Sequence, residues 1–393
     1  MTRRAPAVAA LAVALACGQS RGPTAAPIPA GRFALVVAYL RSQVDSAFPG
    51  AVIAVGRHDS LLLLTAVGHY GIDDSRPVTS ETVYDLASLT KVIGLTTACM
   101  ILVGEGKLDL DAPVQRYVPG FRGAGKERVT IRHLLTHSSG LPAWRPLYTE
   151  TTTRTTALVL VDTTALLRQP GDTFVYSDLG AMVLTQVVEG LTGQRLDAYL
   201  DARVFQQLEM TSTRFLPPSD WRDRIAPTER SQDGTIIRGT VHDENAWKLG
   251  GVSGHAGLFS SAGDLSKFAM WLLTQLRKGD NLYSTCADSP VCTPDVRSSV
   301  VREFIRRQGV PAGSSRALGW DTPSENSSGG TKLGPRAFGH TGFTGTSIWV
   351  DPDKDFYIIL LTNRVNPTRE NGRIARVRPR VADLVVDALT PPQ

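Results

Sequence analysis

Two residues suited to acyl transfer stand three positions apart at the start of an apolar stretch. Ser88 and Lys91 face the same way if a helix begins near Ser88. A neighbouring amine can activate a serine hydroxyl, and the N–H groups at a helix start favour the negative charge that develops during attack. A serine followed by a lysine three residues later also occurs by chance, as a surface pair. The apolar run Val92–Leu102 favours the catalytic interpretation, because it predicts a buried helix that opens on this pair.

A second cluster that could move protons is Tyr176-Ser177-Asp178, which precedes the apolar helical run Leu179–Val188. A tyrosine on such a loop can reach the Ser88–Lys91 pair and exchange a proton with the serine or with a leaving group. The alternative is a half-buried tyrosine that only packs, which is the usual environment of this residue.

A third cluster, His340-Thr341-Gly342, lies on a segment with the pattern of a β-strand. A small polar strand edge that contains glycine lets the backbone of a substrate lie close and pair with it. The alternative is an ordinary strand end followed by a turn. If the three clusters meet, they predict a site for attack on an amide or an ester.

These S-x-x-K, Y-S-D and H-T-G elements, in this order, resemble the motifs of the penicillin-binding protein and β-lactamase superfamily, on the branch similar to class C β-lactamases. The segments Val129–Pro142 and Gly254–Ser261 agree with this resemblance, which covers Phe33 to Leu389. It implies that Ser88 is the acylated nucleophile and that Lys91 and Tyr176 are the general base and acid. The remaining implied site residues are Ser88 and Phe343, whose N–H groups form the oxyanion hole, and Asp178, His340, Thr341 and Gly342, which contact the substrate.

Two positions depart from the pattern of many relatives. Asp178 stands where asparagine is common, and a carboxylate can only accept hydrogen bonds. We expect it to pair with Lys91 and keep the ammonium protonated, which shifts the role of base toward Tyr176. His340 stands where lysine is common and is only partly charged near neutral pH, so it should bind a substrate carboxylate weakly. Both changes argue against a potent β-lactamase.

The order of the predicted elements indicates an α/β (α+β) fold of the β-lactamase/transpeptidase type. A helix within residues 31–48, a hairpin of strands 50–57 and 60–68, three late strands and a helix over 374–389 form a sheet lobe from residues 31–87 and 295–390. Mostly helical patterns over residues 88–294 form the other lobe. Together the lobes make one domain over residues 31–390, with the site in the cleft between them.

The N-terminus has the pattern of an export signal. Arg3 and Arg4 precede the apolar stretch Ala5–Ala16, and small residues precede Cys17, as at a bacterial lipoprotein cleavage site. We expect a signal peptide over residues 1–16, a lipid on Cys17 and a flexible tether over residues 17–30, hence a periplasmic or membrane-anchored protein. The alternative is an ordinary secretory signal with an incidental cysteine. Of the other cysteines, Cys286 and Cys292 could close a small disulfide, and Cys99 is expected to be a buried free thiol.

Composition and charge exclude some partners. The net charge of +5 is not concentrated in basic runs, so nucleic-acid binding is not expected. No metal or organic cofactor is predicted, and membrane contact is expected only through the N-terminal anchor. The expected substrate is a cell-wall peptide, an ester or a β-lactam, in the order D-alanyl-D-alanine carboxypeptidase, esterase, β-lactamase. A non-catalytic penicillin-binding sensor and a scaffold lipoprotein are the alternatives to an enzyme; the oligomeric state is not predicted.

Overall fold

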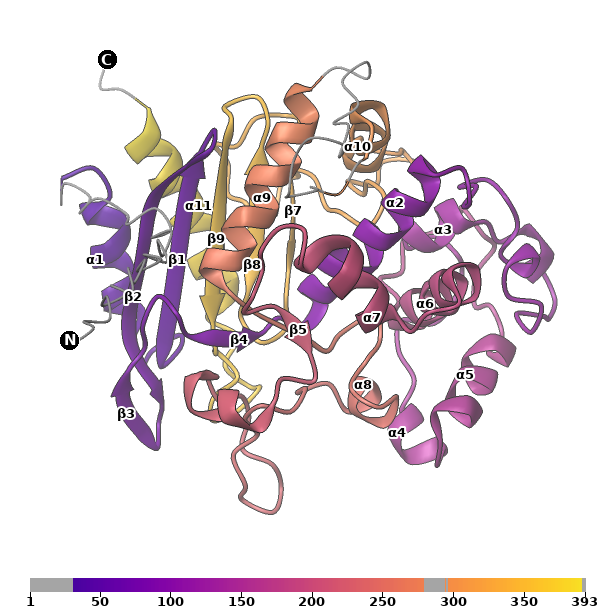
Figure 1. Cartoon of the computed structure of the whole chain (residues 1–393), viewed down its shortest axis with the longest axis horizontal. Helices are drawn as coiled ribbons and strands as arrows, with labels where there is room; N and C mark the ends of the chain where they lie inside the picture. Colours follow the sequence, from indigo (N-terminus) through magenta and orange to yellow (C-terminus); the bar gives the residue numbers. More distant parts are fainter. Residues whose placement is uncertain (1–30, 279–293, 295, 391–393) are drawn as a thin grey trace, which may run out of the picture.

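The computed structural model describes residues 31–278, 294 and 296–390. The predicted signal peptide, Cys17, the tether and the pair Cys286 and Cys292 lie outside the described residues. The two ends of the described chain meet in a sheet lobe, and the middle of the chain forms a mostly helical lobe beside it (Figure 1). This arrangement matches the order of elements predicted from the sequence.

The main sheet has six antiparallel strands in the order β3-β2-β1-β9-β8-β7. The N-terminal hairpin and the C-terminal strands join where β1 pairs with β9, so the sheet is complete only when both parts of the chain are present. Strand β7 is at one edge, and it carries the third motif. The strands are β1 (Gly50–Arg57), β2 (Ser60–Gly71), β3 (Asp74–Pro77), β7 (Phe338–Thr341), β8 (Ser347–Asp351) and β9 (Phe356–Thr362).

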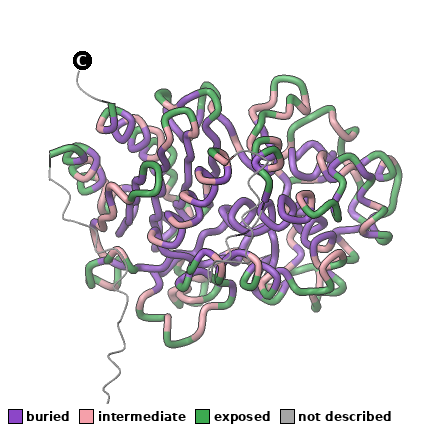
Figure 2. Tube along the Cα trace, turned by 45° about the horizontal axis from the view of Figure 1, so that its top comes forward, coloured by how far each residue is buried: buried purple, intermediate pink, exposed green. Residues whose placement is uncertain are grey.

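Helices cover both faces of this sheet, as the alternation of side chains along β1 requires. Ala51, Ile53 and Val55 pack against helices α1 (Ala34–Gln43) and α11 (Ile374–Leu389). Val52 and Ala54 point the other way, into a core that continues into the helical lobe. Helix α1 is shorter than the predicted range 31–48, whereas α11 has the predicted bounds. Buried residues run through the sheet and its inner helices, and exposed residues gather on outer loops (Figure 2).

Helix α9 (Ala262–Arg277) packs against β1 and β9 and covers the sheet. The sequence placed this segment with the helical lobe, because its apolar periodicity continues that of the preceding segments. Periodicity shows that a helix has a buried face but not which surface that face meets. The other helices are α2 (Thr97–Gly104), α3 (Ile131–Leu135), α4 (Leu147–Glu150), α5 (Arg154–Thr163), α6 (Asp178–Thr192), α7 (Leu196–Leu200), α8 (Glu244–Lys248) and α10 (Ser298–Ile305).

A second, three-stranded sheet in the order β4-β6-β5 was not expected from the sequence. It consists of β4 (Val83–Asp85), β5 (Arg214–Phe215) and β6 (Leu258–Ser261). Strands of two to four residues are too short to show an alternating pattern, so their pairing is visible only in three dimensions. Because β4 ends just before Ser88, this small sheet anchors the start of the nucleophile segment.

The helical segment Ala87–Gly104 is the centre of the core. It is apolar and long enough to span a membrane, with a mean hydropathy of 1.6, but 83% of it is buried inside the fold. It is therefore the core helix that the sequence predicted. Cys99 lies within it as a buried free cysteine, as expected, and burial raises the pKa of its thiol to about 12.

Candidate active site

The nucleophile candidate is exposed at one point of an otherwise buried segment. Within residues 82–102, all of which the structure describes, every residue is buried except Ser88. Ala87 has a positive φ of 47°, a conformation that a residue with a side chain rarely adopts. The carboxylate of Asp85 holds this turn, because its Oδ1 accepts from the N–H of Ala87 at 2.8 Å. The turn presents the Ser88 hydroxyl at the surface of the core.

Lys91 lies below Ser88, and its ammonium has three acceptors. Its Nζ donates to Oγ of Ser88 at 3.1 Å and to the carbonyl oxygen of His255 at 3.0 Å. The third neighbour is Oδ1 of Asp178, 2.7 Å away. An ammonium with three such neighbours has no lone pair with which to accept a proton from Ser88.

The charge on Lys91 is stabilised despite its burial. Burial alone favours the neutral amine, but the carboxylate of Asp178, and then Tyr176, outweigh burial and hold the pKa of Lys91 above its ordinary value. The sequence predicted this pairing of Asp178 with Lys91. Asp178 and Tyr176 both favour the charged form of Lys91 when no substrate is bound, which makes another group the better candidate to accept the proton of Ser88.

Tyr176 reaches the same place from the helical lobe. Ser177 caps helix α6, since its hydroxyl accepts from the N–H of Gly180 at 3.2 Å. The N–H of Ser177 donates to Nδ1 of His137 at 3.1 Å, which fixes the backbone beside Tyr176. The ring of Tyr176 lies between two histidine rings, with centroids 4.5 Å from His137 and 5.8 Å from His340.

Two cations lie beside the ring of Tyr176. The ammonium of Lys91 lies 4.9 Å from the ring centroid and the guanidinium of Arg316 lies 5.8 Å from it. The Tyr176 hydroxyl is buried and has no hydrogen-bond partner of acceptable geometry among the described residues, although it is close enough to Lys91 to raise the pKa of that lysine. Two nearby cations stabilise a negative oxygen. Tyr176 is thus better placed than Lys91 to accept the proton of Ser88.

The third motif forms the open edge of the main sheet. Gly339 exchanges both of its backbone hydrogen bonds with Asp321 at 2.9 Å on the outer side of β7. Thr341, two residues further along, has its backbone N–H and C=O on the same outer side. Beyond Asp321 this edge is open toward the cavity, so an extended substrate can continue the pairing.

The loop after β7 is clamped to the nucleophile turn. The hydroxyls of Thr344 and Thr346 donate to the carbonyl oxygens of Asp85 and Leu86 at 2.7 and 3.0 Å. A Cβ on Gly342 would lie 2.3 Å from the Leu86 carbonyl oxygen, so only glycine fits this approach. The clamp brings the backbone of Phe343 next to Ser88, where the sequence predicted the two N–H groups of an oxyanion hole.

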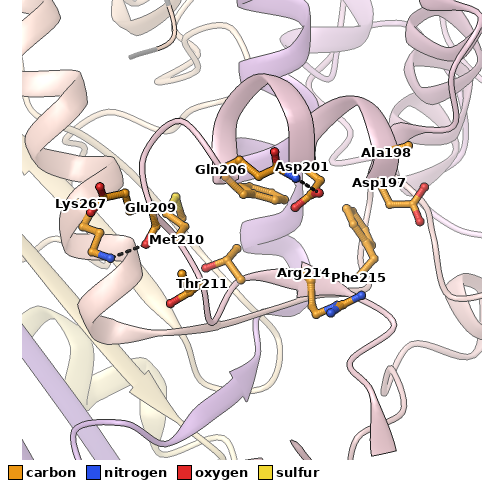
Figure 3. Close-up of a pocket in the computed structure, with 12 residues that line it drawn as sticks. Asp197, Ala198, Asp201, Gln206, Glu209, Met210, Thr211, Arg214, Phe215 and Lys267 are labelled. Carbon is orange, nitrogen blue, oxygen red and sulfur yellow. Dashed lines mark hydrogen bonds between the residues drawn. The ribbon is translucent and has the colours of Figure 1, made fainter. Parts of the chain in front are cut away.

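The motif residues share one cavity of about 380 Å³ with three arginines that the sequence analysis missed. Ser88, Tyr176, His340, Thr341, Gly342 and Phe343 line it, together with Arg316, Arg364 and Arg378. A larger cavity of about 620 Å³ lies around α7 and β5 and contains none of the motif residues (Figure 3). Its size alone does not make it the site of this chemistry. Among the described residues no group of three metal-ligating side chains occurs.

The three arginines hold the loops of the site and still have free donors. Arg364 donates to the carbonyl oxygen of Phe343 at 2.7 Å, and Arg378 donates to that of Gly342 at 2.6 Å. Arg316 donates to the carbonyl oxygen of Gly319 at 3.0 Å. The Nε atoms of Arg316 and Arg378 are buried without a hydrogen-bond partner among the described residues. Burial lowers the pKa of both, but a guanidinium stays charged in a protein, so each favours an incoming anion.

His340 is neutral in this setting. Burial, and then the charges of Arg316 and Lys91, hold the pKa of His340 well below its ordinary value. Its Nδ1 lies 2.8 Å from the carbonyl oxygen of Thr341 and must be the donor of that hydrogen bond. His340 therefore supplies no positive charge to a substrate, as the sequence predicted in part, and the arginines supply it instead.

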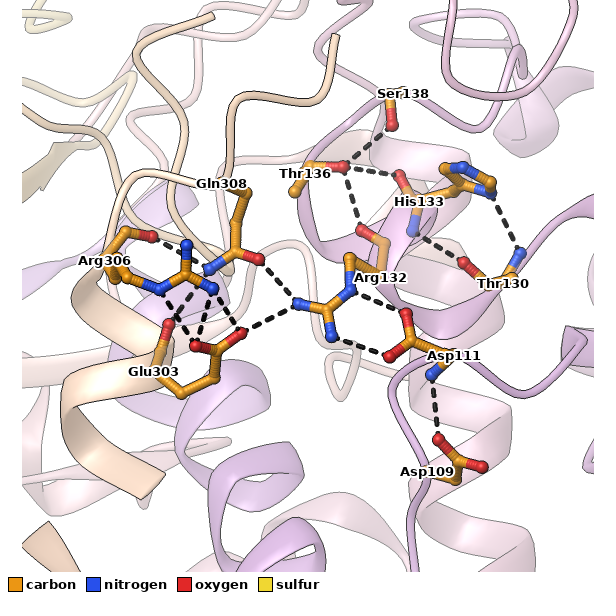
Figure 4. Close-up of polar contacts among 10 residues, drawn as sticks. All are labelled: Asp109, Asp111, Thr130, Arg132, His133, Thr136, Ser138, Glu303, Arg306 and Gln308. Atoms are coloured by element: carbon orange, nitrogen blue, oxygen red, sulfur yellow. Dashed lines mark hydrogen bonds and ion pairs between the residues drawn. The ribbon is translucent and has the colours of Figure 1, made fainter. Parts of the chain in front are cut away.

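The loop that carries Arg316 is fixed from the helical lobe. Arg132 on α3 pairs with Asp111 and Glu303 and donates to the side chain of Gln308 at 2.6 Å (Figure 4). The N–H of Gln308 in turn donates to the carbonyl oxygen of Arg316 at 2.9 Å. The network thus connects α3, α10 and the loop before Arg316, so this guanidinium has a fixed position in the cavity.

Three other histidines near the site fix loops. His133 caps α3 together with Thr130. His242 lies 2.9 Å from Glu229, and His255 lies 2.9 Å from Asp243. His255 also positions the site, because its backbone carbonyl accepts from Lys91.

Comparison with known proteins decides the family. A family model described as Beta-lactamase matches residues 36–382. The chain belongs to the beta-lactamase family. It is 31% identical over 376 residues to a Salmonella typhi protein named "Putative D-alanyl-D-alanine carboxypeptidase", covering 86% of this chain and 83% of that protein. This is the family of serine hydrolases that the three sequence motifs resemble, so the family prediction is confirmed.

Solved structures show the same beta-lactamase/transpeptidase-like fold. A class C beta-lactamase from Rhodobacter sphaeroides has a TM-score of 0.67 at 22% identity and covers 90% of this chain and 99% of that chain. EstCE1, described as a hydrolase with promiscuous acyltransferase activity, has a TM-score of 0.69 at 22% identity and covers 90% of this chain and 98% of that chain. At these identities the likeness concerns the fold, which the sequence analysis predicted.

Replacing Asp178 with asparagine tests its control of Lys91. Asp178→Asn removes a negative charge 2.7 Å from the ammonium, so the pKa of Lys91 should fall. We expect the acidic limb of the pH profile of kcat/KM to move to lower pH by about 1 unit or more, while kcat/KM at its optimum changes less than about tenfold. A profile measured with a p-nitrophenyl ester from pH 4 to 10 checks this; an unmoved acidic limb would contradict the pairing.

Proposed function

We propose that this protein is a D-alanyl-D-alanine carboxypeptidase-like peptidase that removes the C-terminal residue of cell-wall peptides. The observation that carries the proposal is the buried, fixed guanidinium of Arg316 in the same cavity as Ser88. Its nearest carboxylate, Asp321, is 3.9 Å away and leaves donors free for the C-terminal carboxylate of a peptide. The 31% identical Salmonella typhi protein carries a name of the same activity, which supports this choice.

In the proposed reaction the hydroxyl oxygen of Ser88 attacks the carbonyl carbon of the scissile peptide bond. The proton of Ser88 passes to Tyr176, and Lys91 stays charged and stabilises the phenolate before transfer. The N–H groups of Ser88 and Phe343 hold the negative oxygen of the tetrahedral intermediate. Tyr176 then protonates the leaving amine of the terminal D-alanine, which gives an acyl ester on Ser88. Water attacks this ester and gives a proton to Tyr176, which passes it to the departing Oγ of Ser88. The acid product leaves and the free enzyme is restored.

The proposed substrate fits the open edge of β7. An extended peptide can pair with the backbone of Thr341 while its terminal carboxylate reaches Arg316. An esterase is the second candidate, since His340 is neutral. A neutral ester would, however, leave the three arginines of the cavity without a carboxylate to bind, which places this candidate after the peptidase. A β-lactamase comes third, for the same reason that the sequence gave: asparagine and lysine are missing from positions 178 and 340.

A substrate panel with an Arg316 variant separates these candidates. We expect the purified protein to release D-alanine from a D-Ala-D-Ala peptide faster than it hydrolyses penicillin. Arg316→Gln should raise KM for the peptide about 10- to 100-fold, because a charge-assisted contact to the carboxylate is lost. The same variant should hydrolyse a neutral p-nitrophenyl ester within about threefold of the parent, since the ester makes no such contact.

Arg41→Gln, an exposed arginine on α1, serves as the matched control and should change neither substrate. Equal losses for peptide and ester in Arg316→Gln would assign Arg316 a structural role and remove the support for a carboxypeptidase. Ester hydrolysis without any peptide cleavage would favour the esterase. A stable penicillin adduct on Ser88 without turnover of any substrate would identify a sensor.

A further inference from the structure

An apolar groove rimmed by arginines lies away from the proposed active site. Its volume is about 370 Å³, and none of the residues that line it line the cavity of Ser88. Arg336, in its rim, precedes β7, whereas Gly342 of the third motif follows β7. Arg336 and Gly342 are six positions apart, which corresponds to about 20 Å of extended chain, so these two residues lie at opposite ends of the strand.

The floor of this arginine groove is aliphatic. Leu273 and Leu276 come from α9 and Ile305 comes from α10, and two prolines continue the apolar surface toward the sheet. Leu276 and Ile305 are half-buried, so their side chains keep exposed area inside the groove. The rim has one carboxylate, Asp355, and five arginines, which are Arg277, Arg302, Arg306, Arg307 and Arg336.

Three of these arginines are already neutralised by acidic neighbours. Their ion pairs are Arg277 with Asp355, Arg306 with Glu303 and Arg336 with Asp353. Figure 4 shows the guanidinium of Arg306 turned toward Glu303. The charge of these three arginines is therefore compensated within the protein. The other two arginines of the rim are Arg302 and Arg307.

Arg302 and Arg307 have no carboxylate partner among the described residues. Arg302 donates to the carbonyl oxygen of Leu276 at 3.1 Å. Arg307 donates through Nε to the hydroxyl of Thr322 at 3.0 Å and through a terminal nitrogen to the carbonyl oxygen of Pro323. Each guanidinium keeps unused donors, so the groove presents two uncompensated positive charges above an apolar floor.

We propose that the arginine groove binds a single-chain amphiphilic anion. Its phosphate or carboxylate head would be held by Arg302 and Arg307, because guanidinium groups bind such anions through paired hydrogen bonds. Its hydrocarbon chain would cover Leu276 and Ile305, which removes apolar surface from water. The volume of the groove is within the range of sites for small molecules. A purely polar anion would leave the floor wet, and an uncharged amphiphile would leave both guanidinium groups unpaired.

Calorimetric titration of the full chain with decyl phosphate, below its micelle concentration, tests this proposal. We expect one saturable site, with inorganic phosphate and decyl maltoside each binding at least about tenfold more weakly. Arg302→Gln/Arg307→Gln should weaken decyl phosphate binding at least about tenfold. Arg41→Gln/Arg376→Gln, two exposed arginines on α1 and α11, is the matched control and should bind as the parent does.

A second variant guards against loss of folding, because Arg307 also supports Thr322. Ile305→Asp leaves all five arginines in place and adds a negative charge to the floor, so it too should weaken binding at least about tenfold. Both variants should keep one cooperative thermal transition above the temperature of the titration, with Ile305→Asp unfolding at the lower temperature because Ile305 packs against the core. Labelling of Ser88 by an active-serine probe should stay as in the parent, which keeps this test independent of the proposed function. Equal binding of decyl maltoside, or unchanged binding in the double variant, would overturn the proposal. Binding only to phosphatidylglycerol vesicles would also overturn it and indicate a membrane contact instead.

Discussion

Ser88→Ala is expected to lower kcat/KM by about 10⁴-fold or more for both a D-Ala-D-Ala peptide and a p-nitrophenyl ester. The reason is positional. Ser88 is the one residue of the buried segment 82–102 that reaches the surface, and its Oγ accepts from Lys91 at 3.1 Å in the cavity that holds Tyr176. Alanine keeps the turn and removes only the oxygen that forms the acyl ester.

The loss should concern chemistry and not folding. Alanine occupies less space than serine at a half-buried position, so the temperature of unfolding should stay within a few degrees of the parent value. A fluorophosphonate probe should label the parent once and leave Ser88→Ala unlabelled when intact mass is measured. Ser60→Ala, at an exposed position at the start of β2, is the matched control. Full turnover by Ser88→Ala would reject Ser88 as the nucleophile.

The sequence was informative where chemistry depends on local spacing. Ser88 and Lys91 are three residues apart, so one turn of helix suffices to bring them together. The contributions of the two ends of the chain to the sheet lobe were also predictable. Strands β1 and β2 are short apolar runs separated by turn residues, and α11 has a periodic apolar pattern. The pairing of Asp178 with Lys91 was predictable too, since the order of the motifs already places the two side chains in one cleft.

The arginines of the site could not be found in this way. Arg316 belongs to no motif, and it reaches the cavity because Arg132 and Gln308 fix its loop from another element. Arg378 lies on α11, where a charged residue in an amphipathic pattern is normally exposed. Their buried positions depend on contacts between distant parts of the chain. In a sequence such residues look like ordinary surface charges, although here they line the cavity of Ser88.

The clamp between Thr344, Thr346 and the nucleophile turn was missed for a similar reason. Threonine in a loop is common, and only the register of β7 beside Asp85 and Leu86 gives these hydroxyls their acceptors. The positive φ of Ala87 is likewise invisible in a sequence, because alanine is not a residue that predicts such a turn. The predicted oxyanion hole thus depends on backbone geometry that no single residue type indicates.

The second large effect on activity is expected from the general base, which is either Lys91 or Tyr176. If Lys91 were the base, it would have to lose a proton while Asp178 lies 2.7 Å away and the carbonyl of His255 lies 3.0 Å away. Both neighbours favour the ammonium. Asp178, and then Tyr176, hold the pKa of Lys91 above its ordinary value against the effect of burial. Proton transfer from Ser88 to Tyr176 leaves the charge of Lys91 in place. It uses Tyr176 as the phenolate, and two cations face that ring.

Tyr176→Phe is therefore expected to lower kcat by about 10³-fold and to leave KM within about threefold of the parent. Phenylalanine keeps the ring between His137 and His340, so the cavity should retain its shape and only the proton acceptor is lost. Single-turnover acylation and steady-state hydrolysis of the ester should slow together, because the same oxygen serves both half-reactions. Tyr39→Phe on α1 is the matched control. Retention of most acylation activity in Tyr176→Phe would return the role of base to Lys91, and would require the Lys91–Asp178 pair to separate when substrate binds.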